Sequence, residues 1–71
     1  MVKTIDELRK GFEERFHIKM MIYQLHGKIR FNEHRNRYEE TITNQGELTD
    51  NEKLGVAWLD GAWFMYQELN K

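Results

Sequence analysis

Apolar residues in the last third of the chain recur at intervals of three and four, which predicts an amphipathic helix. Thr49 followed by Glu52 has the capping-box pattern, in which each side chain satisfies the other's free backbone N–H, so we expect the helix to begin there. We expect one stripe of this helix, with Trp58 at its centre, to face the core. Its members are Leu54, Trp58, Leu59, Ala62, Met65, Tyr66 and Leu69.

Further apolar residues lie largely off that stripe, namely Val56, Trp63 and Phe64. The apolar surface therefore extends around more than half of the helix, a pattern that requires either a well-wrapped core or a partner. The two glycines of this helix, Gly55 and Gly61, predict close approach of another backbone.

A second helix is predicted near the start of the chain, with Thr4 as its N-cap and Ile5, Leu8, Phe12 and Phe16 along one side. Because the spacing of apolar residues continues through Met20 and Tyr23, we expect one helix that runs to about Leu25. Gly27 would then supply the left-handed residue that ends it.

Residues 28–43 alternate between apolar and polar side chains, which predicts a β-hairpin around a polar turn at residues 32–36. The expected inner face consists of Ile29, Phe31, Tyr38 and Ile42. The predicted fold is thus a single small α+β domain over residues 1–71. Two helices pack on a two-stranded antiparallel hairpin in the order α-β-β-α, because a hairpin of this size is not stable alone.

Composition limits the classes of protein that this chain can belong to. The sequence has 71 residues, no cysteine and a net charge of −1, and its longest apolar run, residues 20–23, is far shorter than the ~20 residues that a membrane span needs. No signal peptide is visible. We expect a protein without disulfides or membrane contact, located in the cytoplasm.

The residues that catalysis or metal binding would need are missing or wrongly spaced. The chain has no serine or cysteine to act as a nucleophile, and its five glycines are scattered rather than gathered in a phosphate loop. The histidines at positions 17, 26 and 34 do not have the i, i+4 spacing of helical metal ligands. We therefore expect a binding protein rather than an enzyme, with no metal or cofactor.

Two segments are candidates for binding a partner. The hairpin carries basic side chains interleaved with aromatic ones, an arrangement suited to gripping phosphates of a nucleic acid. Its candidate contact residues are Lys28, Arg30, His34, Arg35 and Arg37. Alternatively, Arg30 and Arg37 pair with Glu39 or with the acidic last helix inside the same molecule.

The other candidate is the aromatic side of the last helix that the core leaves uncovered. We expect Trp63, Phe64 and Tyr66 to bind a protein there, since tryptophan and tyrosine dominate the energetics of protein interfaces. Self-association through this helix, giving a homodimer, is a further alternative.

The chain also resembles a class of short proteins of tailed bacteriophages and prophages. The resemblance lies in Phe12-Glu13, in the segment from Asn32 to Tyr38, and in a tryptophan-rich helix with Ala57-Trp58, Ala62-Trp63, Tyr66 and Gln67. It implies an accessory protein in the host cytoplasm that binds a host protein and inhibits it by steric or allosteric occlusion. The resemblance carries no catalytic residues.

Overall fold

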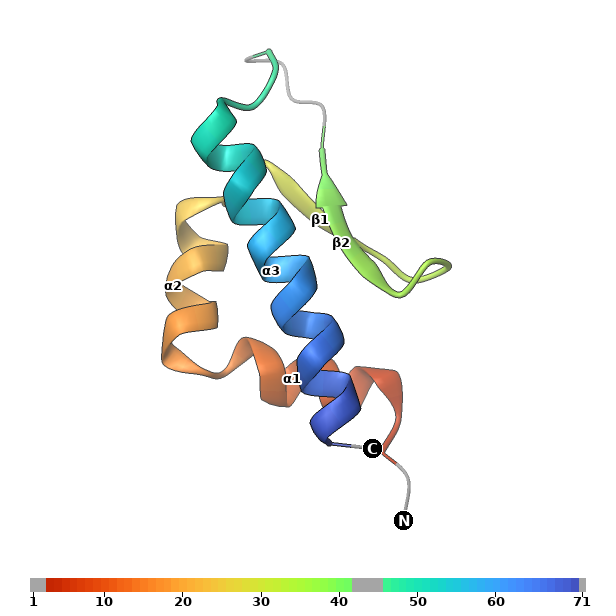
Figure 1. Cartoon of the computed structure of the whole chain (residues 1–71). Helices are drawn as coiled ribbons and strands as arrows, with labels where there is room; N and C mark the ends of the chain where they lie inside the picture. Colours follow the sequence, from red (N-terminus) through yellow and green to blue (C-terminus); the bar gives the residue numbers. More distant parts are fainter. Residues whose placement is uncertain (1–2, 42–45, 71) are drawn as a thin grey trace.

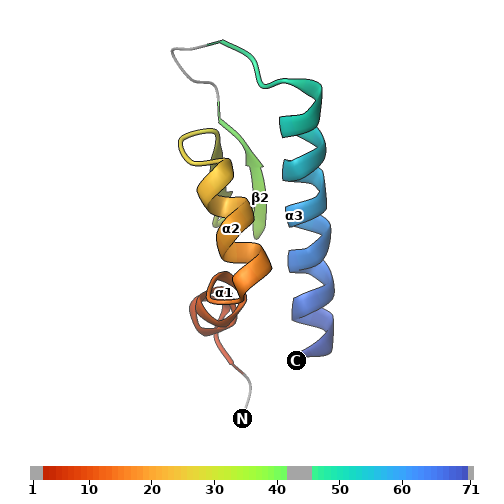
Figure 2. The same ribbon diagram turned by 90° about the vertical axis from the view of Figure 1, so that its left-hand side faces the viewer.

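The computed structural model describes residues 3–41 and 46–70, which form three helices and one hairpin (Figure 1). The elements are α1 (Ile5–Glu13), α2 (Phe16–Gln24), β1 (Ile29–Asn32), β2 (Arg37–Glu40) and α3 (Asp50–Leu69). The α+β class and the antiparallel hairpin are as predicted. Figure 2 shows α1 and α2 on one side of the molecule and α3 on the other.

The prediction of one continuous first helix is wrong, because the chain turns between α1 and α2. Arg15 is extended, with φ −66° and ψ 138°, and its N–H bonds the carbonyl of Phe12 at 3.2 Å. In one helix, Phe12 and Ile18 would point roughly 120° apart, since each residue turns the helix by about 100°. The turn at residues 14–15 allows both side chains to be buried in one core.

The ends of the helices follow the local signals in the sequence. The Thr4 hydroxyl accepts the N–H of Glu7, and both halves of the Thr49–Glu52 capping box are formed. Gly27 has φ 80° in the turn after α2, so the left-handed terminator is confirmed.

The hairpin lies with β2 against α3. Phe31 pairs with Tyr38 in the register, and the Tyr38 N–H at the outer edge of β2 donates to Asp60 Oδ1 at 3.0 Å. Asn36 closes the turn with φ 53°, a left-handed conformation that asparagine tolerates. Of the predicted inner face, Ile42 lies outside the described residues.

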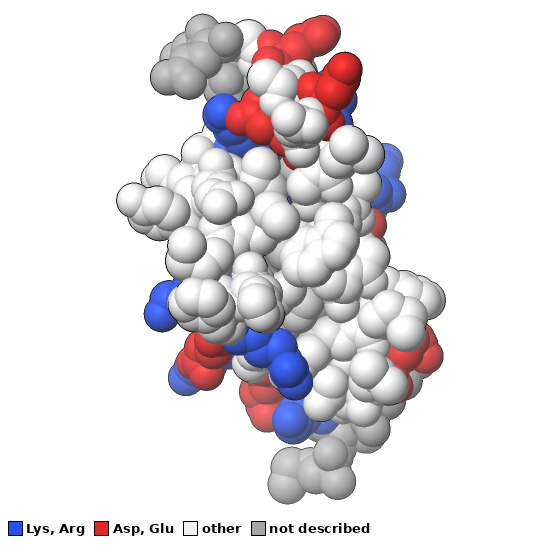
Figure 3. Space-filling view, turned by 60° about the vertical axis from the view of Figure 1, so that its left-hand side comes forward, with Lys and Arg blue, Asp and Glu red and all other residues white. Residues whose placement is uncertain are grey.

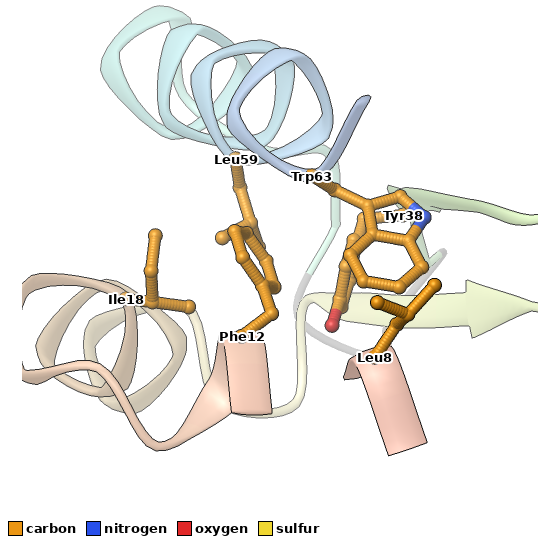
Figure 4. Close-up of a cluster of buried hydrophobic side chains, with 6 residues drawn as sticks. All are labelled: Leu8, Phe12, Ile18, Tyr38, Leu59 and Trp63. Carbon is orange, nitrogen blue, oxygen red and sulfur yellow. The ribbon is translucent and has the colours of Figure 1, made fainter. Parts of the chain in front are cut away.

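The core gathers side chains from α1, α2, β2 and α3 (Figure 4). Its buried members are Leu8, Phe12, Ile18, Tyr38, Leu59 and Trp63, and a smaller cluster holds Leu25, Leu48 and Val56. Trp63 is at the centre, with its ring centroid 5.3 Å from that of Phe12 and 5.7 Å from that of Phe31. Its indole Nε1–H donates to the carbonyl oxygen of Asn36 at 3.1 Å.

The structure reverses the expected roles of the two tryptophans. Trp63 is 1% exposed, whereas Trp58, predicted at the centre of the core stripe, is 49% exposed. The five-residue step from Trp58 to Trp63 turns the helix by about 140°, so only one of the two tryptophans can face the core. Burial of Trp63 is favoured because its N–H finds a carbonyl partner there.

We predict that Trp63→Ala lowers the free energy of unfolding by about 3–5 kcal/mol, because it removes the largest buried side chain of the core. The adjacent Phe64 is 60% exposed, so Phe64→Ala should change that free energy by no more than about 0.5 kcal/mol. Urea titrations followed by circular dichroism measure both values. Similar losses in the two variants would contradict this core.

Candidate protein-binding surface

The three aromatic residues predicted to bind a protein do not form one surface. Trp63 is buried, and Tyr66 is partly buried, with its ring centroid 5.4 Å from that of Phe12. The Tyr66 hydroxyl also lies against Gly11, where a Cβ would come within 2.6 Å of it. Among these three, Phe64 alone is exposed, so the predicted site is not assembled as expected.

The structure instead exposes the apolar side of α3 that was predicted to be core. Leu54, Trp58, Met65 and Leu69 are all exposed and lie on one side of the helix, with Gly61 among them. At about 100° per residue, these five positions lie within an arc of about 80° on the side of α3 away from Trp63. The sequence shows the spacing of this stripe, but it does not show whether the stripe faces the core or the solvent.

A second exposed stripe runs along α2, on the side of that helix away from Ile18. Its residues Phe16, Met20 and Tyr23 have i, i+4 and i+7 spacing. We define the apolar face as the seven exposed side chains of the two stripes: Phe16, Met20 and Tyr23 from α2, and Leu54, Trp58, Met65 and Leu69 from α3. Figure 3 shows the uncharged area over these two helices, with charged groups gathered toward its ends.

The apolar face is large for a domain of this size. Its side chains are between 44% and 78% exposed. At about 200 Å² for a fully exposed large side chain, these fractions correspond to roughly 900 Å². The largest apolar patch of a typical monomer is about 300–600 Å², and larger ones mark interaction sites.

The two helices that carry the apolar face are held together beneath it. Gly55 of α3 lies under the end of α2, where its Cβ position is 3.5 Å from both Leu25 Cδ1 and Met21 Sδ. Side chains at the end of α2, rather than another backbone as predicted, therefore approach this glycine. Gly61 differs, since nothing lies within 4 Å of its Cβ position, and it forms an open notch in the α3 stripe.

Most of the basic side chains on the hairpin are paired within the molecule. Lys28 bonds Glu52, Arg30 Nη2 lies 2.9 Å from Glu39 Oε1, and Arg37 Nη2 lies 3.6 Å from Asp60 Oδ2. The predicted alternative for Arg30 and Arg37, pairing with Glu39 and with the acidic helix, is confirmed. His34 and Arg35 are exposed in the turn.

These pairs lower the pKa of two carboxyl groups. Hydrogen bonds from Asn32 and Arg30 hold the pKa of Glu39 below its ordinary value of 4.5. The hydrogen bond from Lys28, followed by that from the Thr49 backbone, does the same for the pKa of Glu52. The carboxylates are thus stabilised by partners in their own chain.

The hydroxyl of the buried Tyr38 also has a hydrogen-bond partner within the molecule. The Tyr38 hydroxyl donates to Glu13 Oε2 at 2.6 Å, and the Arg9 Nε–H donates to the same oxygen at 3.1 Å. Burial raises the pKa of Tyr38, and the hydrogen bond to Glu13 raises it further. Because Arg9 also stacks over the Phe31 ring at 4.4 Å, this network joins α1 to the hairpin.

Other kinds of site have less support in the structure. A hollow of about 460 Å³ is an open groove between β2 and α3 that contains the Arg37–Asp60 pair. Within residues 3–41 and 46–70, no cluster of three or more histidine or acidic side chains is arranged to hold a metal ion. In the same ranges, no helix has the length and apolar character required to cross a membrane.

The fold and this surface define a class: a small α+β domain with one broad uncharged face on α2 and α3. Comparisons with protein-family models, curated proteins and solved structures find no match to the chain.

We predict that Lys28→Gln raises the pKa of the Glu52 carboxyl toward 4.5, because it removes the largest cause of the shift. A carboxyl with a lowered pKa in the folded state stabilises the fold above pH 4.5, and this stabilisation is lost as the pH falls through the folded pKa. The variant should therefore lose less stability than the parent on acidification. Carboxyl NMR titration measures the pKa directly.

The matched control is Arg35→Gln, which removes a basic side chain from the same hairpin without touching Glu52. It should leave the Glu52 pKa unchanged. An unaltered Glu52 pKa in Lys28→Gln would contradict the pairing.

Proposed function

We propose that this protein is a non-catalytic binding protein that docks onto another protein chain through the apolar face of α2 and α3. The observation that carries the proposal is the roughly 900 Å² of apolar side chain that the stripes of α2 and α3 leave exposed. Figure 3 shows a broad uncharged area over these two helices. Leaving this area in water is unfavourable by about 25 cal/mol for each Å², so its burial would drive association.

The position of the face on two packed helices also supports a binding role. Met21 of α2 and Leu25 at its C-cap lie against Gly55, so the two stripes have a fixed relation before any partner arrives. A preformed surface loses little conformational entropy on binding. Trp58 is half-exposed near the middle of the α3 stripe, and tryptophan in that position is the residue type most often found at interface hot spots.

The identity of the partner as a host protein, and inhibition by occlusion, stay predictions that rest on the resemblance to phage accessory proteins. The nucleic-acid alternative has weaker support, because Lys28, Arg30 and Arg37 already have acidic partners. A phosphate backbone would have to compete with Glu52, Glu39 and Asp60 for them.

We predict that Trp58→Asp abolishes binding while the domain stays folded by circular dichroism, because it places a charge in the apolar face. Immobilised protein would be exposed to a bacterial lysate supplemented with an untagged copy of the same chain, and retained proteins identified by mass spectrometry. Arg35→Glu is the matched control: it changes an exposed hairpin residue away from the face and should retain the same proteins.

Two results would overturn the proposed function. One is that the parent chain retains neither a lysate protein nor the untagged copy. The other is that retention survives Trp58→Asp but is lost in Arg35→Glu, which would move binding to the hairpin and make it dependent on charge.

A further inference from the structure

We propose that the chain that covers the apolar face is a second copy of this protein, bound through an antiparallel pair of α3 helices. This inference rests on the proposed function, because it names the partner of the same surface. Four features of α3 carry it: the order of its exposed residues, the notch at Gly61, the size of the face and the charge at one end of the helix.

The exposed residues of α3 have a nearly palindromic order. A two-fold axis that passes between Gly61 and Ala62 places Leu54 opposite the partner's Leu69 and Trp58 opposite the partner's Met65. Each contact occurs twice, as an isologous interface requires. The pairings are also chemically suitable, since aliphatic side chains meet each other and a thioether meets an aromatic ring.

The centre of that arrangement is where two helices could approach most closely. Gly61 has no side chain, its Cβ position is open, and Ala62 beside it is small. The bulky Trp58 and Met65 stand on either side of this notch along the stripe. A facing helix of the same sequence has its own notch at the same place, so the two surfaces fit without change of shape.

The size of the face agrees with a stable dimer. The four exposed side chains of α3 amount to roughly 500 Å², and those of α2 bring the apolar face to roughly 900 Å², against about 800 Å² on each partner in an interface of standard size. Charged groups lie toward the ends of the face rather than within it (Figure 3). Two copies would therefore pair without burying an unmatched charge at the centre.

The orientation of the pair follows from the charges of α3. Its first turn carries Asp50 and Glu52, and its last turn has no basic residue. Parallel helices would bring the two Asp50 carboxylates together, while Glu52 is already paired with Lys28. Antiparallel helices separate them by about 30 Å, the length of a 20-residue helix, and oppose the helix dipoles favourably.

The first test measures the mass of the purified chain by light scattering and sedimentation over a range of concentrations. We expect twice the 8.7 kDa of one chain at high concentration. Gly61→Lys should raise the dissociation constant of the dimer at least about a hundredfold, since it places two like charges side by side at the axis. The monomer should tolerate it, because nothing lies within 4 Å of that Cβ position.

The matched control is His34→Lys, which adds the same charge to the exposed hairpin turn and should leave the dimer unchanged. A mass of one chain at all concentrations would overturn the proposal. Equal dissociation by both variants would also overturn it, because the effect would then come from net charge rather than from the α3 contact.

The second test determines the orientation of the two helices. Because the sequence has no cysteine, each introduced cysteine is the only thiol of its chain. Leu54→Cys and Leu69→Cys chains, one of them isotopically labelled, would be mixed and treated with a short thiol cross-linker. Antiparallel pairing predicts links between the two variants. It predicts none within Leu54→Cys alone, because those two positions would lie about 22 Å apart. Links within Leu54→Cys alone would overturn the antiparallel arrangement.

The dimer and the proposed function can fail separately. A monomeric chain that still retains a lysate protein through Trp58 would overturn only the dimer. A monomeric chain that retains nothing would overturn both.

Discussion

The burial of Trp63 is the interaction on which the rest of this structure depends. Its ring contacts Phe12 of α1 and both strands of the hairpin, so one side chain joins elements that are far apart in the sequence. The indole N–H bonds the carbonyl of Asn36 in the hairpin turn. Because a buried N–H without an acceptor is costly, this bond fixes the rotation of α3 about its own axis.

The rotation of α3 decides which apolar residues are left in water. Once Trp63 and Leu59 face the core, Trp58 and Met65 must face away from it. The other elements are short: α1 and α2 have nine residues each, against 20 in α3, and they lie on one side of it (Figure 2). A chain of this size buries only about 60% of its surface, so the outer side of α3 stays uncovered.

The parts of the fold that sequence reasoning predicted are those set by local chemistry. The capping box at Thr49, the left-handed Gly27 and the alternating hairpin each depend on residues close together in the chain. The rotation of α3 is not local, because its apolar residues surround the helix and the acceptor for Trp63 lies 27 residues away. The turn at Arg15 was not predicted for a similar reason, because it allows side chains to be buried against residues that are distant in the sequence. The predicted protein-binding surface was therefore placed on the wrong side of α3.

The basic side chains of the hairpin are largely paired with acidic side chains of the same molecule. The basic hairpin lies beside the acidic helix, and Lys28–Glu52 and Arg37–Asp60 join the two. The fold leaves apolar side chains exposed to water, whereas most of the hairpin's basic side chains have acidic partners. Surface ion pairs contribute about 0–1 kcal/mol each and weaken with salt, whereas burial of apolar area is only weakly affected by moderate salt. Binding through the α2–α3 face should accordingly depend on shape and apolar contact, with the surrounding charges acting mainly on orientation.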